Sequence, residues 1–421
     1  MKYFIFILLS FLYIFGPVVN SIGSWVDFIF ITSVLITAYA RVIYGTKIPS
    51  YFKYFALFIP VSIYSLITIM NYPDAAFADY FRFLLKPIRI LITIYAGYSL
   101  VFFIRKYYGS KYQIVVYTFV FIACILHGGI MTYQLFNPEF KDWVYALITT
   151  GDYRSSYGYN FRMGGLSGST GGAVLSVVQA LGILVIPSVF KHTSVVGKLI
   201  LVIGGLFLFF TILICGRSGI YVVILFIPFL IFLSAKIVNV SFMLKILAVL
   251  VFLISAFIGL LKLYDSVESK SPLYYALTRS LDTFLDARKS GSFDDKTVVT
   301  LQDHIVFPND VKTWVLGNPE HLVKTQYDRT LNSDIGYIRN IWSFGIFFSF
   351  SYWVPIIIFA IISFLLIRKY DSAKLVFVLS LLMLFFHAKE NYLYVRMFLS
   401  VYSMVLFTLY FEVREKISEY K

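Results

Sequence analysis

Apolar segments run along most of the chain, and one polar stretch of about 75 residues, from Asp265 to Arg339, interrupts them. Most of these segments have about 17–25 residues, the length at which an α-helix crosses a hydrocarbon core of about 30 Å. We therefore expect transmembrane helices at residues 3–19, 25–43, 54–70, 84–104, 113–136, 172–190, 199–215, 219–234, 243–263, 341–367, 375–388 and 395–411. This pattern predicts an all-α polytopic integral membrane protein with about 12 transmembrane helices.

The two longest polar segments divide the predicted spans into groups. The expected parts are helices one to five (1–136), a polar loop (137–171), helices six to nine (172–263), a large polar loop between helices nine and ten (264–340), and helices ten to twelve with a tail (341–421). The first apolar run follows a single lysine and has no small-x-small cleavage site. It is therefore predicted to be a retained helix and not a signal peptide.

Composition excludes an ordinary soluble domain. The chain is 59% hydrophobic and only 14% charged, whereas soluble domains are about 25% charged. A net charge of +14 would suggest nucleic acid in a soluble protein, but here the basic residues lie in short loops between apolar runs. We expect no nucleic-acid partner. Cys124 and Cys215 lie in or at the ends of apolar segments and match neither a disulfide framework nor a metal site.

The distribution of basic residues predicts the orientation. If the N-terminus is cytoplasmic, every short loop on that side is basic, as the positive-inside rule requires. That side then collects 17 of the 36 basic residues: Lys2, Arg41, Lys47, Lys53, Arg105, Lys106, Lys111, Lys191, Lys198, Lys236, Lys245, Arg368, Lys369, Lys374, Arg414, Lys416 and Lys421. Both termini are predicted to be cytoplasmic, and both long polar loops are predicted to lie on the outer side.

Basic residues on the outer side break this rule and need another explanation. Arg82, Lys86 and Arg89 are spaced i, i+4, i+7 at the outer end of the fourth span, so they share one helical face. Arg162 lies in a stretch rich in Gly and Ser before the sixth span, and Arg217 lies at the turn between the seventh and eighth. The last outer turn adds three more candidates: His387, Lys389 and Arg396.

These cations indicate an anionic ligand. Charges in or near a bilayer are costly and mark substrate or ion pathways by default. The planar fork of arginine binds phosphate oxygens in pairs, and backbone N–H groups at 163–172, before a helix, would add to the same effect. A cluster of cations without matching carboxylates suits the diphosphate of a lipid carrier. The alternative is that each cation only reaches lipid head groups.

The large outer loop supplies a candidate carboxylate. Asp334 is placed where the loop re-enters the membrane, just before Gly336 and Tyr337. A carboxylate there, beside a cationic pocket, suits a general base toward a sugar hydroxyl; the alternative is a cap on the next helix. Asp294 and Asp295 have no partners at metal-ligand spacing, so neither a metal site nor a cofactor is expected.

An amphipathic helix is predicted inside the same loop. Leucines recur every four residues at Leu273, Leu277, Leu281 and Leu285, and the segment also carries Arg279 as a further candidate. This rhythm indicates a helix that lies on the membrane or over the mouth of a cavity.

Several of these stretches together resemble the superfamily of O-antigen polymerases (Wzy-type) and O-antigen ligases. The resemblance covers roughly residues 150–400, and the order and common sidedness of its motifs carry it. The motifs are Arg162-Met-Gly-Gly-Leu166, Gly216-Arg-Ser-Gly219, Trp314-Val-Leu-Gly317, Asp334-Ile-Gly-Tyr-Ile338 and Gly345-Ile346. Ile335 replaces the asparagine that is usual after the aspartate. Because the ligase branch typically has histidine at the position of Asp334, the resemblance favours a polymerase.

The resemblance implies a GT-C-like fold with a large periplasmic loop in the bacterial inner membrane. It also implies metal-independent glycosyl transfer without a cofactor, in lipopolysaccharide or other surface polysaccharide biosynthesis. The donor would be a glycan on undecaprenyl diphosphate, and a second lipid-linked repeat unit would be the acceptor. The diphosphate would be held by Arg162, Arg217, Arg82, Lys86 and Arg89.

The resemblance also implies that Asp334 and Arg217 are the catalytic residues. Asp334 would deprotonate or orient the acceptor hydroxyl, and Arg217 would stabilise the leaving diphosphate. Further candidate site residues are Arg279, Tyr337, His387, Lys389 and Arg396. A chain-length regulator and a flippase are the expected protein partners.

Three alternatives stay open from the sequence. An O-antigen ligase would transfer finished glycan to the lipid A core. A lipid-linked oligosaccharide flippase or other transporter often has pseudo-symmetric halves and short loops, and no internal repeat is visible here. A structural partner in a polysaccharide assembly complex would need no clustered cations.

Overall fold

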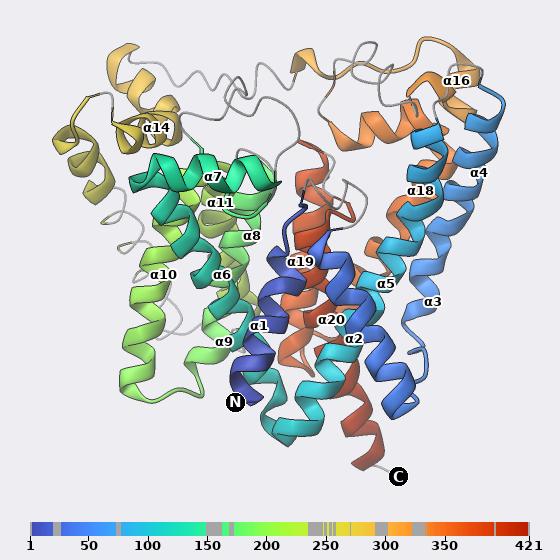
Figure 1. Ribbon diagram of the computed structural model, residues 1–421, viewed down its shortest axis with the longest axis horizontal. Coiled ribbons are helices and arrows are strands. Elements are labelled where there is room, and N and C mark those ends of the chain that lie inside the picture. The colour runs from blue at the N-terminus through green and yellow to red at the C-terminus, as the bar shows by residue number, and fades with distance from the viewer. Residues whose placement is uncertain are drawn as a thin grey trace.

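The computed structural model describes residues 2–19, 27–72, 77–148, 162–167, 172–234, 247, 251, 255, 258–269, 271–290, 302–321, 333, 335–390 and 393–419. These residues are almost entirely helical, and no strand occurs among them (Figure 1). The all-α prediction is therefore confirmed for the part of the chain that is described.

The helices follow the predicted apolar segments closely. The N-terminal part has α1 (Lys2–Phe15), α2 (Phe28–Tyr44), α3 (Phe52–Phe55), η2 (Ala56–Phe58), α4 (Ile59–Met70), α5 (Phe77–Tyr108), η3 (Gly109–Lys111) and α6 (Tyr112–Phe136). The middle part has α7 (Pro138–Ile148), α8 (Ala173–Leu184), α9 (Ile186–Phe190), α10 (Val195–Cys215), α11 (Ser218–Tyr221), the π-helical η4 (Val222–Phe226) and α12 (Ile227–Ser234). The last part has α14 (Pro272–Ser290), α16 (Val311–Leu316), η5 (Pro319–His321), α18 (Gly336–Leu366), α19 (Asp371–His387) and α20 (Arg396–Glu419).

Six helical stretches among the described residues are long and apolar enough to cross a membrane. They are Phe52–Met70, Leu84–Phe136, Ala173–Phe190, Val195–Cys215, Gly336–Leu366 and Arg396–Ser418. The second stretch contains two helices, because the chain turns at Gly109 between α5 and α6. Three shorter apolar helices add to these: Lys2–Phe15, Phe28–Tyr44 and Ser218–Leu233. The chain is a membrane protein; the count of twelve spans and the GT-C-like arrangement stay predictions.

Two predicted segments do not coincide with the described helices and loops. The expected span at 243–263 falls largely outside the described residues. The segment 137–171, expected as a loop, begins with the helix α7, whose residues Val144, Tyr145 and Ile148 are buried together. The amphipathic helix expected near 273–289 is confirmed as α14, with its leucine face packed on α10 and α6.

α20 lies at the centre of the bundle. It packs against α5, α19, α1, α6 and α8. In the most apolar part of α20, 83% is buried inside the protein, whereas the figure for Phe52–Met70 at the periphery is 24%. The N-terminal half of α10 instead exposes Val195, Val196 and Leu199, as expected for a helix face in contact with lipid tails.

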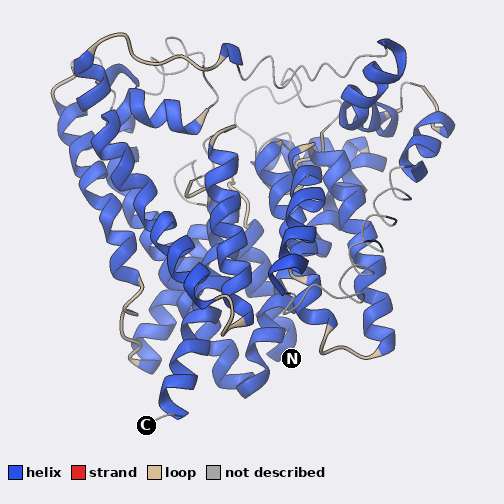
Figure 2. Cartoon of the chain, turned by 180° about the vertical axis from the view of Figure 1, so that it is seen from behind, coloured by secondary structure: helices blue, strands red, loops and turns tan. Residues whose placement is uncertain are grey.

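Both termini lie at the same end of the bundle, and α7, α14 and α16 lie at the opposite end (Figure 1). Figure 2 shows the same arrangement from behind, with the helices spread further apart toward the end that carries these three helices. Termini at a common end agree with an even number of crossings. The assignment of that end to the cytoplasm stays a prediction from the basic loops.

α18 is kinked where it meets α16. Gly345 has φ +68° and ψ 172° inside the helix, and a Cβ atom there would lie 2.1 Å from the carbonyl oxygen of Val315. A Cβ atom on Gly317 (φ +74°) would likewise lie 2.6 Å from the carbonyl oxygen of Ser343. Only glycine permits backbones this close in a left-handed conformation. The Leu-Gly segment and the Gly-Ile pair of the resemblance are therefore in contact.

Candidate functional site

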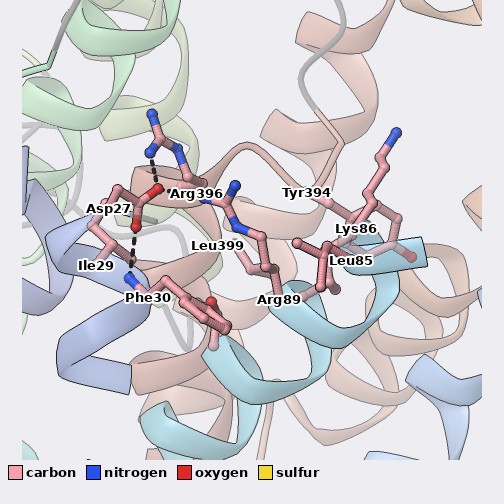
Figure 3. A pocket seen from close by; sticks show the side chains of 11 residues that line it. Asp27, Ile29, Phe30, Leu85, Lys86, Arg89, Tyr394, Arg396 and Leu399 are labelled. Carbon is pink, nitrogen blue, oxygen red and sulfur yellow. Dashed lines mark hydrogen bonds and ion pairs between the residues drawn. The ribbon is translucent and has the colours of Figure 1, made fainter. Parts of the chain in front are cut away.

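The first group of charged residues forms where α2 begins. Asp27 is fully buried, and its carboxylate caps α2 by accepting the backbone N–H of Phe30 at 2.6 Å. The same carboxylate forms ion pairs with Arg89 of α5 and Arg396 of α20 (Figure 3). One acid thus ties together three helices that are far apart in the sequence.

A cavity of about 330 Å³ lies beside this ion-paired group. Lys86 also lines it and stands apart from Asp27 in Figure 3, with its Nζ 5.2 Å from the centre of the Tyr352 ring. The remaining lining residues are Ile29, Phe30, Leu85, Ile90, Thr93, Tyr394 and Leu399. Three cations and one carboxylate give the lining a net charge of +2. The cavity therefore suits an anion that also carries apolar groups.

A second group of cations lies at the turn between α10 and α11. A Cβ atom on Gly172 would lie 3.9 Å from Nη1 of Arg162, and one on Gly216 would lie 2.9 Å from the carbonyl oxygen of Gly172. Arg162 and the Gly216–Gly219 turn with Arg217 thus adjoin the same glycine. Lys389 reaches this turn from the loop after α19, where its Nζ donates to Ser218 Oγ at 3.0 Å. The structure thus places Arg162 and Lys389 beside the turn that carries Arg217.

The backbone that carries Arg162 is held by hydrogen bonds to the bundle. The N–H groups of Met163 and Gly164 donate to Ile214 O at 2.9 Å and Tyr145 Oη at 2.8 Å. Those of Gly165 and Leu166 donate to Gln134 Oε1 at 2.9 Å and His127 Nε2 at 3.0 Å. These amides were expected to bind an anion. That expectation is wrong for 163–166, because the protein itself takes up all four donors.

His127 acts as a rigid support for this segment. Its ring stacks on Phe15 with centroids 4.2 Å apart, and a Cβ atom on Gly165 (φ +56°) would lie 2.4 Å from the ring. Because Nε2 accepts a backbone N–H, the neutral ring carries its hydrogen on Nδ1. The side-chain nitrogen Nε2 of Gln179 lies 2.9 Å from Nδ1, so the Gln179 side chain contacts the other nitrogen of the ring. Sequence reasoning missed His127, Gln134 and Gln179.

A third group surrounds the start of α18. The buried His387 contacts Asn340, with Nε2 3.0 Å from Nδ2. A Cβ atom on Gly336 would lie 2.3 Å from Nδ1 of His387, so the ring packs directly on the backbone. Tyr337 packs edge-on against the same ring and donates to Leu384 O at 2.8 Å. The predicted residues His387 and Tyr337 are therefore in contact.

Asp334, the candidate base, lies outside the described residues. Its neighbours in the chain, Ser333 and Ile335, are both buried. Ser333 Oγ donates to His304 O at 2.7 Å, and Ser333 O accepts from Arg339 Nε at 2.5 Å. Ser333 is thus fixed to the loop that carries His304 and to the first turn of α18.

The turn between α19 and α20 connects the three groups. Lys389 contacts Ser218, and Arg396 contacts Asp27. Between them Tyr394 donates to Tyr352 O at 3.0 Å and adopts φ +60°, a conformation that is uncommon outside glycine. Residues 387–396 therefore reach the cavity, the Arg217 turn and the start of α18 from one short segment.

Two further candidates are not part of these groups as described. Arg82 belongs to α5, and its side chain is not among those that the structure describes. Arg279 is on α14, where its neighbour Ser280 donates to Leu213 O at 2.6 Å. Arg279 is thus near the end of α10 and is not part of the cavity lining.

Asp27 is the main residue that sequence reasoning missed. A usable signal was present, because Asp27 is the only acidic residue among the first 73 and stands at the start of an apolar segment. A charge at that position marks a functional or structural site by default.

No protein-family model, curated protein or solved structure matches this chain.

Proposed function

We propose that this protein is a surface-polysaccharide polymerase of the O-antigen type. It joins undecaprenyl-diphosphate-linked oligosaccharide repeat units by glycosyl transfer at the periplasmic face of the bacterial inner membrane. The observation that carries the proposal is that Arg162 and Lys389, from separate parts of the chain, both adjoin the Gly216–Gly219 turn that carries Arg217.

The reaction needs stabilisation of the leaving diphosphate. The acceptor hydroxyl oxygen bonds to the anomeric carbon of the donor sugar, while the bond from that carbon to the diphosphate oxygen breaks and its electron pair leaves with the diphosphate. Fixed cations that face the departing oxygens lower the barrier because they need no rearrangement as charge develops. Arg162, Arg217 and Lys389 supply this charge, so the proposed transfer is metal-independent.

The hydroxyl proton also needs an acceptor. We assign this role to Asp334, whose chain neighbours Ser333 and Ile335 are buried and which stands two residues before Gly336, the residue on which His387 packs. A carboxylate in hydrogen-bond reach of the hydroxyl takes the proton as the new bond forms. His387, clamped by Asn340 and packed on Gly336, is a positioning residue for this segment.

Substitution of Arg217 tests the proposal. In Arg217→Gln, polymer formation from purified lipid-linked repeat units should fall by about 10²–10³-fold, the loss typical when one transition-state donor is removed. Arg217→Lys should retain more activity because the charge remains. The matched control is Lys198→Gln, in the first turn of α10 and so at the other end of that helix from Arg217. Its polymer formation should stay within about twofold of wild type. Equal activity in Arg217→Gln and Lys198→Gln, at equal protein levels, would contradict the diphosphate role.

Deletion of the gene separates the alternatives. Loss of a polymerase leaves lipopolysaccharide capped by single repeat units. Loss of a ligase leaves uncapped core with accumulated lipid-linked polymer, and loss of a flippase leaves lipid-linked units on the cytoplasmic side. Either of the last two results would overturn the proposal.

A further inference from the structure

The cavity beside Asp27 is built from different elements than the Arg162–Arg217–Lys389 group. Its charged residues come from the start of α2, from α5 and from α20. None of Arg162, Arg217 or Lys389 lines it. Among the described residues, the turn between α19 and α20 contributes to both groups, through Arg396 and Lys389, while their other cations differ, so we treat them as two sites.

The charge of the lining matches a particular kind of anion. The lining contains three cations, Lys86, Arg89 and Arg396, and the carboxylate of Asp27, which leaves a net charge of +2. A diphosphate diester carries two negative charges at neutral pH, whereas an anionic phospholipid head group such as phosphatidylglycerol carries one. The diphosphate therefore fits the lining without excess charge on either side.

The size and polarity of the cavity restrict the occupant further. Its volume of about 330 Å³ is at the lower end of ligand pockets, which range over about 300–1,000 Å³. That is room for a head group and the first part of an apolar chain, and too little for an oligosaccharide as well. Ile29, Phe30 and Leu399 offer the apolar wall that such a chain needs.

Asp27 arranges the two arginines for this task. Each guanidinium has five N–H donors, and the ion pairs to Asp27 engage Nη2 of Arg89 and Nη1 of Arg396. The donors on the other nitrogens remain for a ligand. Without the buried carboxylate, two guanidinium groups held this close would repel each other and turn apart.

We infer that this cavity is a second diphosphate site, which holds the acceptor lipid while the Arg162–Arg217–Lys389 group holds the donor, and that Asp27 is its positioning residue. The inference rests on the proposed function, because only an enzyme that joins two lipid-linked units needs both sites at once. Both sites adjoin the α19–α20 turn, close to the start of α18, where the transfer would occur.

Counting bound lipid tests the inference without requiring catalysis. The full-length protein in detergent is titrated with a radiolabelled undecaprenyl diphosphate that carries a single sugar, which is a diphosphate diester, and saturation is expected at about two molecules per chain. Lys86→Met and Arg396→Gln should each reduce this to about one, and so should Arg217→Gln. Lys86→Arg keeps the charge and should keep both sites. Thermal unfolding midpoints identify any variant that has lost its fold, and Lys86→Met, which leaves the Asp27 ion pairs intact, is the primary variant.

Three results would overturn the inference: saturation of wild type at one molecule per chain, unchanged saturation in Lys86→Met, or displacement of half the label by an equal concentration of phosphatidylglycerol. The last result would mean a general site for anionic phospholipids. Two bound lipids with no polymer formed would instead count against the proposed function and leave the second site standing. Polymer formation with a single bound lipid would support the proposed function and count against the second site.

Discussion

At the scale of single residues, Asp27 connects the start of α2 to two other helices. It is a fully buried carboxylate that caps α2 and forms ion pairs with Arg89 of α5 and Arg396 of α20. Such a group is costly to bury, and its ion pairs offset that cost only while both partners are present. The two arginines are partly exposed, at 19% and 39% of their side-chain surface, so solvent screens part of their charge.

Asp27→Asn should lower the free energy of unfolding by about 2–4 kcal/mol, somewhat less than for a fully buried pair because of this screening. Denaturant titration in detergent micelles measures the change. Asp371→Asn is the matched control, because Asp371 pairs with Lys374 at 2.6 Å while 57% exposed; its loss should cost at most about 1 kcal/mol. Similar effects in both variants would contradict the structural role of Asp27.

At the scale of elements, the kink in α18 sets where α16 can pack. Gly345 bends the helix so that α16 approaches it, and Gly317 returns the contact. The start of α18, with Gly336, is fixed on His387 in a similar way. Glycine positions thus bring the α16 and α18 backbones together on the side of the bundle that carries the site.

Gly345→Ala should destabilise the protein by about 3 kcal/mol or more, because alanine is strained at positive φ and its Cβ would collide with backbone that has no room to move. Gly129→Ala is the control: this glycine lies on the exposed face of α6 with nothing within 4 Å of a Cβ. It should be neutral or stabilising by up to about 1 kcal/mol. Thermal unfolding of both variants measures the difference, and equal midpoints would be inconsistent with the kink.

The sequence predicted the helices well because apolar length alone determines them in a bilayer. It also predicted that Arg162, Arg217 and Lys389 share one side. It could not predict that Tyr145, Gln134 and His127 accept the hydrogen bonds of the amides at 164–166, because such pairings depend on contacts between distant helices. The partnership of Asp27 with Arg89 and Arg396 was hidden for the same reason.

At the scale of the whole molecule, the distribution of charge gives the bundle two different ends. The end with the termini carries basic loops, and the opposite end carries α7, α14, α16 and the converging site. This polarity is the basis for placing the proposed reaction outside the cytoplasm.

Cysteine labelling checks the orientation. A membrane-impermeant maleimide applied to cells with a permeabilised outer membrane should label Val311→Cys on α16 and leave Ser110→Cys, at the α5–α6 turn, unlabelled until the inner membrane is broken. Both positions are exposed, and the native Cys124 and Cys215 are buried, so background reaction is small. The reverse labelling pattern would invert the topology.

The central place of α20 has a consequence for assembly. This helix follows every other described helix in the chain, so during synthesis it leaves the ribosome after them. Until it inserts, α5, α1, α6 and α8 lack one of the helices they pack against, and Asp27 can pair with Arg89 alone. The earlier helices can already contact one another, but the wall of the cavity that contains Arg396 and Leu399 is missing. The cavity and the second ion pair of Asp27 are therefore completed only when α20 arrives.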